Sequence, residues 1–106
     1  MRWSNSVNIF DLPQIDDMSV EISDILIKSE NVTVERIISR GNTTDWYDQI
    51  QNEYVILLQG KAVIEHENGE KINIKKGGTL YLPARLKHRV AYTSSKPPCI
   101  WICIFW

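Results

Sequence analysis

The chain has 106 residues, of which 43% are hydrophobic, and 12 basic side chains stand against 13 acidic ones. This length predicts a single domain, residues 1–106, with enough apolar side chains for one core. The net charge of -1 argues against the clustered basic face that nucleic-acid-binding proteins need, so we expect no nucleic-acid partner.

No targeting or membrane-spanning segment is visible. Residues 1–10 (MRWSNSVNIF) lack the apolar core of a signal peptide, and the longest apolar run, residues 99–106 (CIWICIFW), is too short to cross a bilayer as a helix. The two cysteines, Cys99 and Cys103, would lie about 13 Å apart on one strand, which is too far for a disulfide. We therefore expect a soluble, cytoplasmic protein with reduced cysteines and no membrane partner.

The first half of the chain predicts an arm followed by three strands. Residues 1–19 are interrupted by a proline and are expected to form an irregular N-terminal arm. Residues 18–28 (MSVEISDILIK) fit both a helical stripe and a strand face, and we favour a strand from about Glu21. Residues 32–39 are rich in β-branched side chains, which favour strands. The apolar run of residues 53–58 indicates a strand buried on both faces.

The second half predicts strands separated by short turns. Residues 61–75 read as a hairpin, with Asn68 and Gly69 as a type I′ turn. A further turn is expected at residues 75–78, and later strands at residues 79–83, 88–93 and 99–106. About eight strands with almost no helix predict a barrel or a double sheet, because closure removes exposed strand edges.

Two segments follow the spacing of a paired motif. The first, residues 41–60, fits G-x5-H-x-H-x3-E-x6-G at Gly41, Tyr47, Gln49, Glu53 and Gly60. The second, residues 77–92, fits G-x5-P-x-G-x2-H-x3-N at Gly77, Pro83, Arg85, His88 and Tyr92. This pair resembles the signature of the cupins, although both histidines of the first motif are replaced, as are the last glycine and the asparagine of the second. The resemblance implies an all-β fold, the cupin double-stranded β-helix or jelly-roll barrel, in a small single-domain protein.

The resemblance also implies which residues line a site. In cupins that retain all four positions, three histidines and the glutamate bind a divalent metal ion. The matching positions here are Tyr47, Gln49, Glu53 and His88. Only Glu53 and His88 are ordinary transition-metal ligands. Tyr47 would have to lose a proton whose ordinary pKa is about 10. The expected cofactor is a divalent metal ion at a degenerate site, or none.

Strand geometry predicts a polar pocket even without a metal ion. Side chains two residues apart share a strand face, so Val90 and Tyr92 are expected to face inward with His88. Glu53 would pair with His88 inside an apolar barrel, where convergent polar groups mark a binding site. We therefore expect a small-molecule ligand in the barrel. The alternatives are a metal-free isomerase or epimerase, with His88 and Tyr92 or Tyr47 as acid and base, and a non-catalytic sensor or partner-binding module.

Other reactive side chains have simpler interpretations. His66 lies in the predicted hairpin and is expected to be solvated. Cys103 is interpreted as an inert buried cysteine, although its strand could bring it to the cavity. Arg85 and Lys87 flank the predicted barrel mouth, where an anionic ligand would meet them, but we favour plain loop charges.

The C-terminal strand predicts self-association. Residues 100–106 (IWICIFW) are apolar on both faces, whereas a barrel wall buries only one. Because large exposed apolar patches mark interfaces, we expect a homodimer, with Trp3 and Phe10 of the arm helping to cover this face.

Overall fold

The protein was analysed as a computed structural model, which describes residues 6–13 and 19–106. That part of the chain contains strands and no helix. The strands are β1 (Ile22–Lys28), β2 (Thr33–Ser39), β3 (Glu53–Gln59), β4 (Lys61–His66), β5 (Lys71–Lys75), β6 (Thr79–Leu82), β7 (His88–Thr93) and β8 (Cys99–Phe105). The preference for a strand from about Glu21 is confirmed by β1. The described residues include no helical segment with the length and apolarity needed to cross a bilayer.

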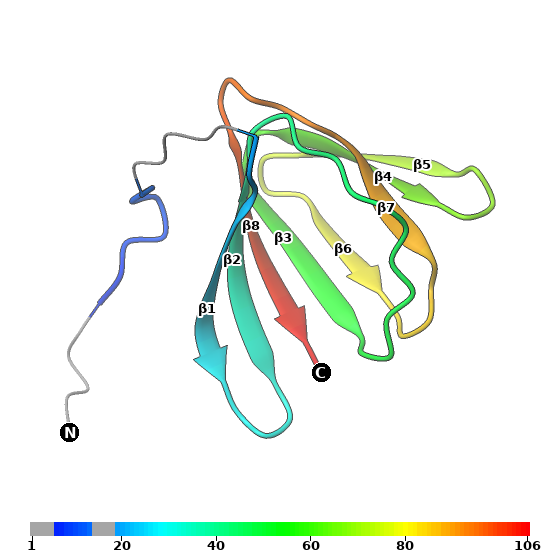
Figure 1. The fold of residues 1–106 in the computed structure, drawn as a ribbon, viewed down its shortest axis with the longest axis horizontal. Coiled ribbons are helices and arrows are strands. Elements are labelled where there is room, and N and C mark those ends of the chain that lie inside the picture. Colours follow the sequence, from blue (N-terminus) through cyan, green and yellow to red (C-terminus); the bar gives the residue numbers. More distant parts are fainter. Residues whose placement is uncertain (1–5, 14–18) are drawn as a thin grey trace.

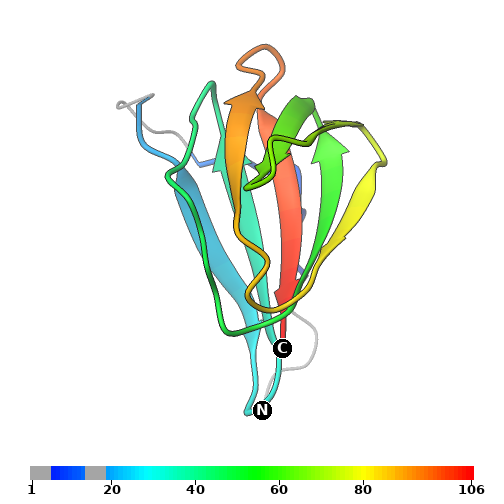
Figure 2. The same ribbon diagram turned by 90° about the vertical axis from the view of Figure 1, so that its right-hand side faces the viewer.

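The strands form two antiparallel sheets that face each other (Figures 1 and 2). The larger sheet has the order β1-β2-β8-β3-β6, and the smaller sheet has the order β5-β4-β7. Neighbours along the chain are often not neighbours in the sheet: the last strand, β8, lies between β2 and β3. This arrangement confirms the all-β, jelly-roll architecture expected from the sequence.

The core lies between the two sheets and follows strand alternation. In β3, Val55 and Leu57 point inward, and β8 contributes Trp101 opposite Leu57. The smaller sheet contributes Ile64 from β4 and Ile74 from β5. Since β8 is a central strand, its alternate residues face the core on one side and the outer face of the larger sheet on the other.

The hairpin between β4 and β5 differs from the predicted turn. Gly69 has a φ of 90°, but Asn68 does not have a positive φ, which a type I′ turn would require. Instead, the Gly69 amide donates to the carbonyl of His66 (2.9 Å), and the His66 amide donates to the carbonyl of Glu70 (2.8 Å). The loop therefore holds three residues, of which only the glycine adopts the left-handed conformation. The hairpin prediction is correct and the turn type is wrong.

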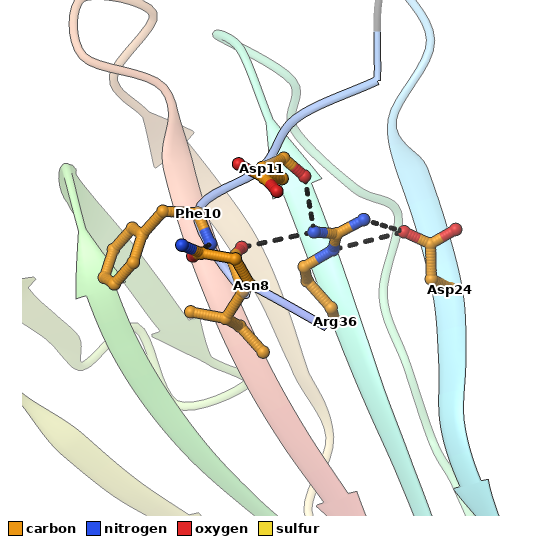
Figure 3. A network of polar contacts seen from close by, with 6 residues as sticks. Asn8, Phe10, Asp11, Asp24 and Arg36 are labelled. Atoms are coloured by element: carbon orange, nitrogen blue, oxygen red, sulfur yellow. Dashed lines mark hydrogen bonds and ion pairs between the residues drawn. The ribbon is translucent and has the colours of Figure 1, made fainter. Parts of the chain in front are cut away.

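The described part of the N-terminal arm is attached to the outer face of the larger sheet through Arg36 (Figure 3). The Arg36 guanidinium donates to the carbonyls of Ile9 (3.2 Å) and Asp11 (2.8 Å), and its Nε donates to Asp24 of the neighbouring strand (3.1 Å). Arg36 is thereby almost fully buried. Phe10 of this arm is 52% exposed, and Trp3, the other residue expected to cover the apolar face, falls outside the described residues.

Candidate functional site

A cavity of about 280 Å³ lies between the sheets. Its polar lining includes Glu21, Glu35, Tyr47, Gln49, Glu53 and His88. Apolar walls come from Val55, Ile64, Leu82, Val90 and Trp101. This volume is near the lower end of the range of about 300–1,000 Å³ for small-molecule pockets. The cavity thus has room for a compact guest and holds all four side chains named by the motif.

Glu53 and His88 meet in this cavity from opposite sheets. Glu53 begins β3 and His88 begins β7, and their exposed fractions are 8% and 3%. The Glu53 Oε1 and His88 Nε2 atoms are 3.8 Å apart, which is beyond hydrogen-bond distance. Burial raises the pKa of Glu53 above its ordinary value, while His88 and a hydrogen bond from Gln49 partly oppose that rise.

The imidazole of His88 is held in one orientation. Its Nδ1 lies 2.8 Å from the carbonyl oxygen of Leu86, which can only accept, so Nδ1 carries a proton. In the neutral ring, Nε2 is then the nitrogen with the free lone pair. Within the described part of the chain, Nε2 has no hydrogen-bond partner. The neutral ring of His88 therefore presents a lone pair toward the cavity, whereas the imidazolium, whose charge opposes the rise of the Glu53 pKa, presents an N–H there.

Tyr47 and Gln49 are positioned by the loop that precedes β3. The backbone of Tyr47 forms a bridge with His88, with N–O distances of 2.7 and 3.1 Å. The Gln49 side-chain amide donates to Glu53 Oε1 (3.0 Å), and the backbone carbonyl of Gln49 accepts from the backbone amide of Arg85 (2.7 Å). The two motifs are thus joined by direct hydrogen bonds, and both side chains line the cavity as predicted.

Arg85 occupies the position where the second motif has glycine. Its φ is 67°, a left-handed backbone conformation that residues other than glycine rarely adopt. Its guanidinium pairs with Asp48 through Nε (2.7 Å) and Nη2 (3.1 Å). These bonds and the Gln49 contact stabilise an otherwise unfavourable backbone conformation. The ion pair with Asp48 also holds the Arg85 guanidinium outside the cavity, as expected for a charged residue of a surface loop.

The donor set does not fit a conventional transition-metal site. Burial, followed by the nearby Glu21 carboxylate, raises the pKa of Tyr47, so its phenol resists the deprotonation that ligation requires. The amide nitrogen of Gln49 is directed at Glu53, leaving Glu53 and His88 as the ordinary ligands, whereas metal sites commonly use three or more protein ligands. The described residues contain no group of three His, Cys, Asp or Glu side chains arranged for a metal ion.

Tyr92 is not part of the cavity, contrary to the expectation that it would face inward with His88. In the ladder between β4 and β7, Ile64 pairs with Val90 but Val63 pairs with Tyr92, so Ala91 is an extra residue. A β-bulge of this kind reverses the alternation of the strand beyond it. Tyr92 consequently points outward and is 51% exposed, while Thr93 is buried. The proposed acid–base role of Tyr92 is therefore wrong.

Among the described residues, three titratable side chains that are not motif positions also line the cavity. Glu21 precedes β1, and Glu35 of β2 faces inward because it pairs with Cys103 of β8. Cys103 itself lines the cavity together with Glu53. Burial raises the pKa of the Cys103 thiol well above its ordinary value, in keeping with an inert protonated cysteine. In the sequence, only the alternation of inward and outward side chains along β2 could have indicated that Glu35 faces the cavity.

The remaining candidates lie away from this cavity. His66, Arg85 and Lys87 line a separate, shallower hollow at the β4–β5 end. His66 is half-buried, and its Nε2 atom is buried without a hydrogen-bond partner among the described residues, so the expectation of a solvated side chain is wrong. The reason is the β4–β7 ladder, in which His66 pairs directly with His88.

Comparisons with known proteins agree with this geometry. The cupin domain profile matches residues 37–105. A Ralstonia eutropha JMP134 protein, named a putative mannose-6-phosphate isomerase, is 34% identical, with a TM-score of 0.84 over 95% of this chain and 96% of that one. An RmlC-like cupin protein from Desulfovibrio desulfuricans is 16% identical, with a TM-score of 0.74 over 94% of each chain.

A cupin superfamily protein from Desulfitobacterium hafniense DCB-2 shares the fold as well, with 20% identity and a TM-score of 0.72 over 92% of this chain and 96% of that one. No curated protein matches the sequence significantly. The domain match covers well over half of the chain and includes both motifs, and the two facing sheets enclose the motif residues. The chain therefore belongs to the cupin family.

Proposed function

We propose that this cupin binds a small molecule in its barrel cavity, with Glu53 and His88 as the core of the site and Gln49 and Tyr47 as a second pair. The observation that carries the proposal is the orientation of His88. Its Nδ1 is anchored to the Leu86 carbonyl, and its Nε2 is left without a hydrogen-bond partner in the described chain, next to the buried Glu53 carboxylate. A ring nitrogen that is fixed in orientation, unpaired and directed at a cavity is available for a hydrogen bond to a guest.

The proposal does not require a metal ion. The family often binds metals, but the four motif positions of this chain offer two ordinary ligands, and the described residues hold no group of three His, Cys, Asp or Glu side chains arranged for a metal ion. A guest could instead accept a hydrogen bond from the Tyr47 hydroxyl and donate one to His88 Nε2. We therefore propose binding by hydrogen bonds and apolar contact, and no step is assigned to a metal ion.

A metabolite library screened by thermal shift, followed by calorimetry on the hits, tests the proposal. We expect a compact polar ligand whose affinity falls at least about tenfold, or 1.4 kcal/mol, in His88→Ala and in Glu53→Ala. Treatment with EDTA should leave that affinity unchanged. Tyr92→Ala serves as the control, because Tyr92 is a half-exposed residue of the same strand as His88 but points away from the cavity. A ligand that binds all three variants equally well would contradict the proposed site.

An acid–base enzyme of the isomerase or epimerase type is the second candidate. It is favoured by the free lone pair on His88 Nε2, which can accept a proton from a carbon beside a carbonyl group. On a 2-hydroxy carbonyl ligand, Glu53, with its raised pKa, or Tyr47 can protonate the carbonyl oxygen to give an enediol. The neighbouring hydroxyl of the enediol then returns a proton to that acid, and His88 delivers its proton to the former carbonyl carbon. The name of the Ralstonia protein also suggests isomerisation. Incorporation of solvent deuterium into a bound ligand, lost in His88→Ala, would distinguish this enzyme from a sensor that binds without turnover.

A further inference from the structure

The charge of the cavity lining narrows the class of ligand. Glu21, just before β1, Glu35 of β2 and Glu53 of β3 line the same space. Among the described residues, the lining contains no lysine or arginine. The nearby basic side chains are paired elsewhere: Arg85 with Asp48, and Arg89 with Glu65 at 2.6 Å. The interior therefore presents carboxylates that no lining cation neutralises.

The free nitrogen of His88 adds an independent signal. His88 is 3% exposed, and its Nε2 can accept a hydrogen bond from a guest in the cavity. A protonated amine carries three donors, which suit an imidazole lone pair together with carboxylate oxygens. Aromatic side chains also line the cavity, at Tyr47, Trp101 and Phe105, and their ring faces attract cations.

A phosphate group would meet the opposite situation. Its negative charges would approach three carboxylates at low effective dielectric, where repulsion between like charges is strongest. No described side chain of the lining offers the arginine fork or lysine ammonium that usually binds phosphate. The phosphosugar in the name of the Ralstonia protein is therefore a poor match for the cavity of this chain.

We propose that the cavity takes a small organic cation, a protonated primary amine, and rejects phosphorylated ligands. This inference rests on the proposed function, because it names the ligand class of the same cavity. It adds the carboxylates of Glu21 and Glu35 to the pair formed by Glu53 and His88. Glu35 separates the two proposals, since it contributes charge to the cavity but is not part of that pair.

Three compounds with one carbon skeleton test the charge preference: 1-amino-1-deoxysorbitol, sorbitol and sorbitol 6-phosphate. In calorimetric titrations at pH 7.5 and low ionic strength, we expect the amine to bind at least about tenfold more tightly than sorbitol, and the phosphate to show no binding. Glu35→Gln keeps the shape of the side chain and removes its charge, so it should weaken binding of the amine severalfold more than binding of sorbitol. Glu70→Gln, in the exposed β4–β5 loop, is the matched control and should change neither.

Equal affinity for the amine and sorbitol, or tighter binding of the phosphate, would overturn the inference while leaving the cavity as a binding site. Failure of all three compounds to bind would also overturn it, because an accessible acidic cavity should take the amine. The proposed function would then be judged separately, by the library screen and its Glu53 and His88 variants. Loss of amine binding in Glu70→Gln as well as in Glu35→Gln would assign the preference to overall charge and not to the cavity.

Discussion

Glu53 places a carboxylate in the core of a small protein, and its burial raises its pKa. The folded state therefore favours the protonated acid more than the unfolded state does. Protonated Glu53 therefore contributes its full stabilisation of the fold below the ordinary carboxyl pKa of about 4.3. That stabilisation is lost as the pH rises through the raised pKa of the folded state, where Glu53 becomes charged. At neutral pH, Glu53 thus destabilises the fold relative to a neutral side chain of the same shape.

Glu53→Gln should consequently be more stable than the wild type at pH 8, and the difference should shrink toward pH 4. Glutamine resembles the protonated acid and can still accept the hydrogen bond from Gln49. Urea unfolding at several pH values measures the difference, with the exposed Glu70→Gln as a control that should show no such trend. A Glu53→Gln protein less stable than the wild type at pH 8 would mean that attraction to His88 outweighs the cost of burial.

Most of the candidate site could be predicted from the sequence, because the motif spacing fixes which residues begin β3 and β7. Tyr47, Gln49, Glu53 and His88 all line the cavity as expected. Tyr92 could not be placed, since a single extra residue reverses a strand face and no sequence pattern marked the bulge. Glu35 was missed because its direction depends on its register with β8, a strand more than 60 residues further along the chain.

The strands themselves were easier to predict than the connections between them. Runs of β-branched and apolar residues defined β2, β3 and β8, and turn residues separated the others. The hairpin at Gly69 was predicted with the wrong turn, because one glycine suits both a two-residue and a three-residue loop. The connection between β3 and β4 is tighter still, since Gly60 alone separates these strands, which belong to different sheets.

Gly60 and Gly69 provide a matched pair for testing these connections. Both have a φ near 90°, so alanine is strained at either position by about 1–2 kcal/mol. A Cβ atom on Gly60 would also lie 2.8 Å from the Cys99 and Ser94 side chains and 2.9 Å from the Cys99 backbone, whereas a Cβ atom on Gly69 would meet nothing within 4 Å. The backbone contact cannot be relieved by rotating a side chain.

Gly60→Ala should therefore lower the free energy of unfolding by at least about 2 kcal/mol more than Gly69→Ala does, the scale of an overpacked core. Chemical denaturation of both variants at one pH measures this difference. Equal losses in the two proteins would show that the backbone near Cys99 can move aside, and that the close approach of the two sheets is not a constraint on the fold.

The molecule as a whole has one outer face that is unusually apolar. Strand register turns Ile102 and Ile104 of β8 and Tyr54 of β3 to the outer side of the larger sheet. Tyr81 of β6 lies on the same face and stacks on Trp106, with ring centroids 6.0 Å apart. The arm attached through Arg36 reaches this sheet but leaves Tyr81 51% exposed and Trp106 45% exposed. An apolar face of this kind favours association with a second copy of the chain.

Tyr81 and Tyr92 allow the expected homodimer to be tested with a matched control. Both tyrosines are 51% exposed, but Tyr81 lies on the outer face of the larger sheet and Tyr92 on that of the smaller one. Sedimentation at micromolar concentration should give a dimer for the wild type and for Tyr92→Lys. Tyr81→Lys should raise the dimer dissociation constant at least about tenfold, because a buried lysine at an apolar interface loses its hydration without gaining a partner. A wild-type monomer, or equal effects of the two lysines, would rule out this face as the interface.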